Sequence, residues 1–200
     1  MTADEVRDII KKGNFIHFAI NSDEKHFRAS FSKMEYIMAY EYLNELNKKL
    51  SISSFSIIVP ENIYRGNDRT FSKFINGRKQ LFRDQPLTEM EKIFMNQFKD
   101  FMDPHKPEFT SARMSLWERF LESEHSVKVA TKNILITGFD TDNEIFINAL
   151  NAADMGFVPI VLSDCVSGPS ERNHFNALEF MSRFTYIIDS RDLMSIMGDV

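Results

Sequence analysis

The sequence predicts an α/β fold: a Rossmann-like, open, six-stranded, mainly parallel sheet with helices on both faces. Short apolar segments alternate with helix-period segments along its 200 residues, a pattern typical of strand–helix–strand units. The clearest unit has an apolar run at Ile134–Thr137 closed by Gly138, a helix ending at Gly156, and a second apolar run at Val158–Leu162. Ligands in such sheets bind beyond the carboxyl ends of the strands. We therefore expect a crevice after these two runs.

Length, composition and charge limit the classes of function. With 43% hydrophobic residues, the chain suits one domain over residues 1–200. It has no long uncharged apolar run and no basic segment leading into a hydrophobic one, so we expect no membrane span, no signal peptide and a cytoplasmic location. The lone cysteine, Cys165, excludes an internal disulfide and a CxxC motif. A net charge of -5 argues against nucleic acid as the main partner.

The first part of the chain predicts two helices alternating with two strands. They are a helix at Ala3–Lys12, a strand at Asn14–Asn21, a helix at Ser32–Leu50 and a strand at Ser54–Pro60. We expect His17, inside the first strand, to be a hydrogen-bonded core residue. Asn21, Asp23 and Glu24 follow that strand, where site residues of an open α/β sheet lie. They can also form an ordinary polar turn, and we favour this second interpretation.

Residues 61–84 interrupt this alternation and are predicted to be an irregular basic and aromatic insertion. Its basic and aromatic side chains are Arg65, Arg69, Lys73, Arg78, Lys79, Arg83, Tyr64, Phe71, Phe74 and Phe82. Such a mixture can bind phosphates and stacked bases. It can also pack its aromatic rings on the body of the protein or on a second subunit while the charges stay solvated, and we favour this second interpretation.

The remainder of the chain completes the alternation. The predicted elements are a helix from Thr88, capped with Glu91, to Met102, a strand at Glu108–Ser111, a helix at Ser111–Ser123, a strand at Asn133–Thr137, a helix after Thr141, a strand at Val158–Leu162, a loop CVSGPSE, a helix at Ser170–Phe184, a strand at Thr185–Ile188 and a helix at Ser190–Met197. Helical spacing places Met90, Ile93 and Phe94 on one inner face, and Trp117 and Leu121 on another.

Several motifs occur together in a recognisable order. The predicted fourth strand, ILITG, is followed by Thr141 and by a helix ending in MGF; the fifth is followed by Asp164, Ser167 and His174. PLTEMEK and RMSLW flank the third strand. In order and spacing over most of the chain, these motifs resemble the isochorismatase-like hydrolases, which include cysteine hydrolases acting on nicotinamide or carbamoyl compounds. The resemblance is clearest from Asn133 to Phe184.

The resemblance implies where a catalytic triad would lie. The cysteine hydrolases use an aspartate that ends strand one, a lysine that ends strand three and a cysteine that starts the helix after strand four. The helix N-terminus and the lysine lower the pKa of the thiol, and the aspartate acts as base. The matching positions here are Asn21, Ser111 and Glu144, so all three residues are replaced. A slip of one or two residues would instead bring Asp23 or Arg113 near the site.

Glu144 has two interpretations. In the first, TDNE forms a capping box in which the Glu144 side chain reaches back to the backbone of Thr141. In the second, Glu144 is a catalytic acid, comparable with the aspartate by which the isochorismatase branch protonates a vinyl ether. A helix N-terminus stabilises a charged carboxylate, which is the wrong protonation state for an acid near neutral pH. We favour the capping role.

The remaining pocket candidates are Asp23, Arg113, Phe139, Thr141 and Cys165. Cys165 lies in a loop that should open onto the crevice, but the resemblance assigns it no base, so we expect a buried, small apolar side chain. Some nicotinamidase-like members carry an aspartate and paired histidines after strand two, whereas the segment PENIYRGNDR has no histidine. We predict no metal and no cofactor.

These residues predict an isochorismatase-like protein that has lost cysteine-hydrolase activity. It would serve as a binding, regulatory or assembly protein, as a homo-oligomer with a small-molecule or protein partner. The alternative is a small-molecule hydrolase of isochorismatase or amidase type with a rebuilt site using Asp23, Glu144 or Cys165. A third class, binding of nucleic acid or another anionic partner through Arg65–Arg83, would show salt-sensitive binding.

Overall fold

The computed structural model describes most of the chain. The described residues are 3–12, 15–22, 24–33, 35–39, 41–42, 53–58, 86–101, 108–110, 115–123 and 131–198. The predicted insertion at 61–84 lies outside these residues, as do the candidates Asp23, Ser111 and Arg113.

The predicted open parallel sheet is confirmed. Six strands lie in the order β3-β2-β1-β4-β5-β6, and every described pair of neighbours is parallel. Their bounds are β1 Ile16–Ile20, β2 Ser53–Ile58, β3 Glu108–Thr110, β4 Asn133–Phe139, β5 Val158–Ser167 and β6 Tyr186–Ile188. The strand order reverses direction between β1 and β4, which makes the carboxyl ends of these two strands the expected place for a ligand crevice.

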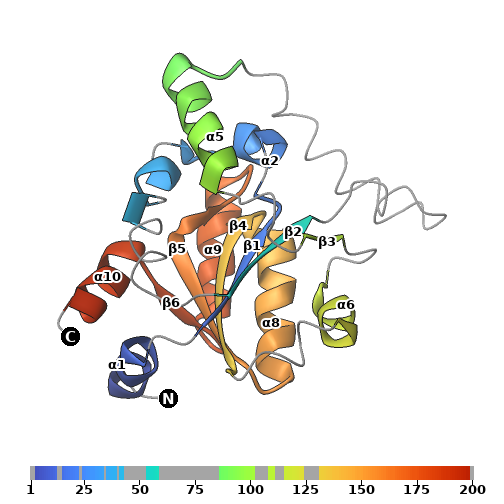
Figure 1. The fold of residues 1–200 in the computed structure, drawn as a ribbon, viewed down its shortest axis with the longest axis vertical. Helices are drawn as coiled ribbons and strands as arrows, with labels where there is room; N and C mark the ends of the chain where they lie inside the picture. The colour runs from blue at the N-terminus through green and yellow to red at the C-terminus, as the bar shows by residue number, and fades with distance from the viewer. Residues whose placement is uncertain are drawn as a thin grey trace.

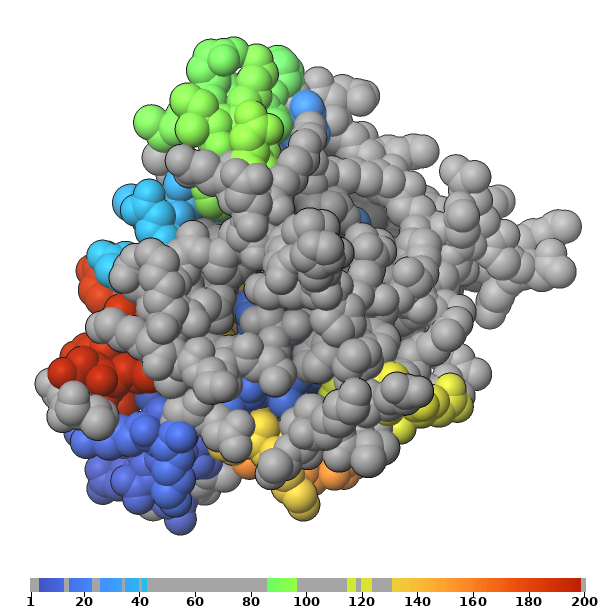
Figure 2. Space-filling view, in the orientation of Figure 1, coloured from blue at the N-terminus to red at the C-terminus, as the bar shows by residue number. Residues whose placement is uncertain are grey.

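Helices cover both faces of the sheet (Figure 1). They are α1 Ala3–Lys11, α2 Glu24–Ala29, α5 Glu89–Phe101, α6 Trp117–Glu122, α8 Phe146–Asp154, α9 Glu171–Met181 and α10 Ser190–Gly198, with a π-helical turn, η2, at Thr141–Ile145. Side chains of β4 alternate between two apolar cores: Leu135 and Phe139 pack with α1, α2, α5 and α10, whereas Ile134 and Ile136 pack with α6, α8 and α9. In the space-filling view, α5 lies at the top of the molecule, and α10 and α1 lie along its left edge (Figure 2).

The core confirms some sequence predictions and corrects others. His17 is buried, and its Nε2 lies 2.9 Å from Thr137 Oγ1, as expected of a hydrogen-bonded core histidine. Trp117 is fully buried, but Leu121 is exposed because the short helix α6 turns Trp117 and Phe120 inward instead. Glu24, predicted to lie in a polar turn after the first strand, is instead the first residue of α2.

The inner face of α5 also differs from the prediction. Phe94 is buried as expected, but Met90 and Ile93 are exposed, and the buried stripe includes Glu91. Glu91 can lie there because the predicted capping box forms: Thr88 N donates to Glu91 Oε2 at 2.7 Å, and Glu91 N donates to Thr88 Oγ1 at 3.3 Å. Because the capped Glu91 lies on the inner face of α5, Met90 and Ile93 lie on its exposed face.

Strand β5 is longer than predicted. It continues past Leu162 to Ser167, so that Cys165 belongs to the strand and not to the following loop. The pairing with β4 shifts along its length, because Ile136 pairs with Val161 whereas Gly138 pairs with Val166. β5 therefore carries a bulge opposite the end of β4, which allows polar residues such as Ser163 and Asp164 to interrupt the apolar pattern.

Gly138 permits a close approach between β1 and β4. Its φ is +113°, and a Cβ added there would lie 1.8 Å from the carbonyl oxygen of Ile20, the residue with which it pairs. A backbone atom cannot move aside as a flexible side chain can, so only glycine fits this position.

We expect Gly138→Ala to lower the free energy of unfolding by about 3 kcal/mol or more, since the new methyl group would push β1 away from β4. Gly156→Ala is the matched control: Gly156 also has a positive φ, of +78°, but no atom within 4 Å of an added Cβ. Its cost should be about 1 kcal/mol. Equal costs for the two variants in chemical denaturation would contradict the steric argument.

Candidate functional site

The carboxyl ends of β1 and β4 meet as the predicted crevice requires. Ile20 pairs with Gly138, so Asn21 follows at the level of Phe139. Asn21 is fully buried and has a left-handed φ of +48°, a conformation that asparagine tolerates better than most residues. Phe139 is fully buried as well, with its ring centroid 4.7 Å from that of Tyr36. Among the described residues, this edge is packed with side chains.

Glu144 is fully buried and turned toward its own helix start. Its Oε2 accepts a hydrogen bond from Asp140 N at 3.4 Å. The predicted partner, the backbone of Thr141, was wrong: the helix begins with a π-helical turn in which Ile145 N donates to Asp140 O at 3.1 Å. This wider turn moves the capped donor back by one residue. The carboxylate still caps a helix start, as the sequence indicated.

Asn148 ties the turn that carries Glu144 to the segment before α6. Its Nδ2 donates to Glu144 O at 2.7 Å, and its Oδ1 accepts from Leu116 N at 2.8 Å. Trp117 Nε1 donates to the Asn148 carbonyl oxygen at 2.9 Å. We did not single out Asn148 from the sequence, although a polar residue between Ile145 and Ala149 on an apolar helix face was an available signal.

Thr141 connects η2 to α9. Its Oγ1 lies 2.8 Å from His174 Nδ1. Burial lowers the pKa of His174 to about 4, although the nearby Asp142 carboxylate acts in the opposite direction. The Asp142 side chain in turn accepts from Asn173 Nδ2 at 2.9 Å. His174 is therefore neutral near pH 7, and Thr141 has a structural partner.

Cys165 lies in the apolar core on the side of α1 and α10. Burial raises the pKa of its thiol well above the usual value, and the Asp164 carboxylate raises it further. Asp164 accepts hydrogen bonds from the backbone N–H and the hydroxyl of Ser190, the first residue of α10. Because the thiolate is the reactive form of cysteine, this setting does not favour a nucleophile.

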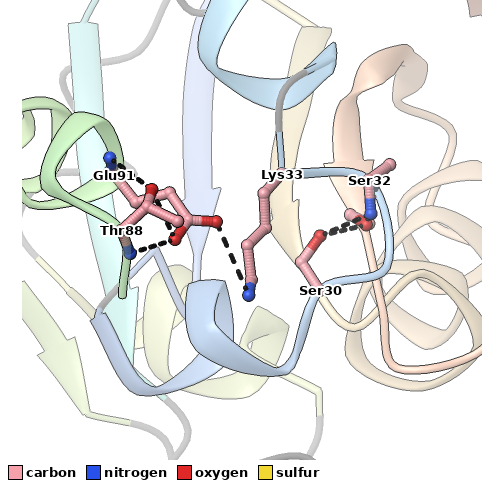
Figure 3. A network of polar contacts seen from close by, with 6 residues as sticks. Ser30, Ser32, Lys33, Thr88 and Glu91 are labelled. Carbon is pink, nitrogen blue, oxygen red and sulfur yellow. Dashed lines mark hydrogen bonds and ion pairs between the residues drawn. The ribbon is translucent and has the colours of Figure 1, made fainter. Parts of the chain in front are cut away.

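A cluster of three serines holds residues 30–32 against the end of β5 (Figure 3). Ser167 Oγ lies 2.6 Å from Ser30 Oγ and 2.8 Å from Ser32 Oγ. Figure 3 also shows Lys33 Nζ reaching toward Glu91 Oε1, at 3.6 Å. Burial raises the pKa of Glu91, but hydrogen bonds from Thr88 and the charge of Lys33 outweigh it and lower the pKa overall. No sequence signal predicted this cluster, because Ser167 lies more than a hundred residues from Ser30 and Ser32.

Two further properties concern possible ligands and location. Within the described part of the chain, no group of three or more His, Cys, Asp or Glu side chains could hold a metal ion. The described helices include none long and apolar enough to cross a membrane.

The strand order and the meeting of β1 and β4 define an open, parallel α/β protein with its crevice edge at the point where the strand order reverses. The sequence matches the family model described as Isochorismatase domain over residues 18–192, so the chain belongs to the isochorismatase family. No curated protein sequence matches the chain.

Several solved structures share the fold of this chain. The MAR1 ribonuclease from Caenorhabditis elegans superposes with a TM-score of 0.61 at 15% identity, covering 93% of this chain and 82% of the other. An isochorismatase-like hydrolase from Alkaliphilus metalliredigens gives 0.59 at 14% identity, covering 92% and 97%. A pyrazinamidase/nicotinamidase from Streptococcus mutans UA159 gives 0.54 at 16% identity, covering 88% and 100%. At these identities the likeness shows the fold.

The pKa of His174 predicts a pH dependence of stability. Between about pH 6.5 and about pH 4 the His174 imidazole is protonated in the unfolded chain but not in the folded protein. The free energy of unfolding therefore falls as pH falls through this range, by at most about 3 kcal/mol. His174→Asn, which can keep a hydrogen bond to Thr141, should remove this part of the fall. Chemical denaturation at about pH 7 and about pH 5 measures it; the same loss in both proteins would contradict the assignment.

Proposed function

We propose that this member of the isochorismatase family does not carry out cysteine hydrolysis and serves as a binding, regulatory or assembly protein. The observation that carries the proposal is the position of Glu144, where the family resemblance expects the nucleophile. Its side chain is fully buried, and a carboxyl oxygen accepts the backbone N–H of Asp140. A capping glutamate has no electron-rich sulfur to attack an amide carbon, so it cannot form the thioester of the cysteine hydrolases.

The other described candidates support the same proposal. Asn21, at the position of the base, has an amide that cannot accept a proton from a thiol in the way a carboxylate does. Cys165, the one thiol in the sequence, is buried in the core on the side of α1 and α10, with its pKa raised. A rebuilt thiol site would need Cys165 to be ionised and accessible to substrate.

The mode of action is part of the proposal. We infer that the protein acts in the cytoplasm as a homo-oligomer, with a small-molecule or protein partner. Exposed apolar side chains on α9, such as Phe180, and on α5, namely Met90 and Ile93, offer surfaces that association would bury. These positions differ from the crevice edge, so binding would not depend on the position of the lost nucleophile.

Hydrolysis assays test this proposal. The purified protein should release no product above the uncatalysed rate from nicotinamide, an N-carbamoyl compound or an isochorismate-type vinyl ether. A nicotinamidase assayed in parallel with nicotinamide shows that the assay detects turnover. Turnover by the wild type that Glu144→Gln abolishes would contradict the proposal and favour a rebuilt site at Glu144, whereas loss on Cys165→Ser would favour Cys165.

A further inference from the structure

A groove with a volume of about 620 Å³ lies apart from Asn21 and Glu144, at the carboxyl end of β5. The residues around it come from the segment 31–35, from β5, from the first two turns of α9 and from the residue after β6. They include Phe31, Glu35, Asp164, Glu171, His174, Phe175 and Asp189. The lining residues that the structure describes thus combine aromatic rings with carboxylates and include no lysine or arginine.

Three rings form one wall of this groove. The His174 ring centroid lies 5.2 Å from that of Phe31 and 5.0 Å from that of Phe175. Phe31 is 37% exposed and Phe175 is 57% exposed, so both leave ring surface uncovered. The serine cluster fixes this wall: Phe31 N donates to Gly168 O at 3.0 Å, between the two serines that contact Ser167. The wall is therefore held in place before any ligand arrives.

The carboxylates divide into two pairs. Asp164 is engaged by Ser190, and Asp189 Oδ1 accepts from Asp192 N at 2.7 Å, so both cap the start of α10. Glu35 and Glu171 are exposed and have no hydrogen bond or ion pair with any other residue that the structure describes. Their charges are not neutralised by the lining, which makes the groove attractive to a cation.

His174 provides a second, independent indication of a ligand. Its side chain is only 4% exposed, and its Nδ1 is occupied by Thr141. Within the described residues, its other ring nitrogen, Nε2, has no hydrogen-bond partner, although the residue lines the groove. Nε2 is not among the fully buried polar atoms that lack a partner, so it stays open to the groove, where water or a ligand can reach it. With the proton on Nδ1, Nε2 would accept an N–H of a ligand.

We propose that this groove binds a small organic ammonium ion with a short apolar body. Phe31 and Phe175 would contact the alkyl part and attract the charge through their ring faces. Glu35 and Glu171 would neutralise the charge, and His174 Nε2 would accept one N–H. A bare metal ion fits less well, since the described residues offer no group of three or more ligating side chains. The site is independent of Glu144, so it does not depend on whether the protein hydrolyses anything.

Isothermal titration calorimetry with cadaverine, a linear diamine, tests the proposal. We expect saturable binding at one site per chain, and binding of the neutral analogue pentanediol at least about 10-fold weaker, because the charge is the recognised feature. Glu35→Gln and Glu171→Gln should each weaken cadaverine binding about 5-fold or more, and Phe175→Leu should also weaken it, because it keeps apolar volume but removes the ring.

Glu179→Gln is the matched control. Glu179 is an exposed glutamate on α9 outside the groove lining, so its replacement should leave cadaverine binding unchanged. Equal affinity for the diol, no measurable binding of cadaverine, or equal weakening by Glu179→Gln would each overturn the proposal. Displacement of cadaverine by magnesium ions at comparable concentration would overturn it too, since it would show attraction of any cation by surface charge.

Discussion

The contact between Gly138 and the carbonyl of Ile20 is the constraint on which the crevice edge depends. It lets β1 and β4 end side by side, with Asn21 and Phe139 following at the same level. From there the chain enters the π-helical turn at 141–145, whose width decides that Glu144 caps Asp140. Asn148 and His174 then join this turn to the segment before α6 and to α9. One close backbone approach therefore sets the geometry of the turn at which the sequence resemblance places the nucleophile.

Much of the fold could be predicted from the sequence, because strand and helix periods differ and buried parallel strands are nearly continuous in apolar residues. The two runs around Gly138 and Val158 were placed correctly for this reason. The misses were local. Strand β5 continued through Ser163 and Asp164 because Ser190 satisfies Asp164 from a distant segment. The inner face of α5 was misplaced because a capped Glu91 took a buried position that apolar counting cannot foresee.

The site was harder to predict than the fold. Sequence pattern indicated Glu144 as a cap, and only the atomic partner differed. The Thr141–His174 hydrogen bond and the serine cluster around Ser167 join residues that no local pattern connects. The groove lined by Phe31 and Phe175 could not be predicted from the sequence either. Its wall combines the segment at Phe31 with helix α9, and these are far apart along the chain. Asp23, Ser111, Arg113 and the segment 61–84 remain predictions.

Unfolding measurements on Glu144→Ala test most directly whether this carboxylate, at the position where the sequence resemblance expects the nucleophile, is structural. A structural cap requires a loss, because the variant leaves the buried N–H of Asp140 without its acceptor. We predict a free energy of unfolding lower by about 2 kcal/mol or more, with a change below about 0.5 kcal/mol for the exposed control Glu179→Ala. A residue kept for function is often held at a cost to the free energy of unfolding, so a functional Glu144 would not require this loss. A Glu144→Ala protein as stable as the wild type, or more stable, would contradict the structural role.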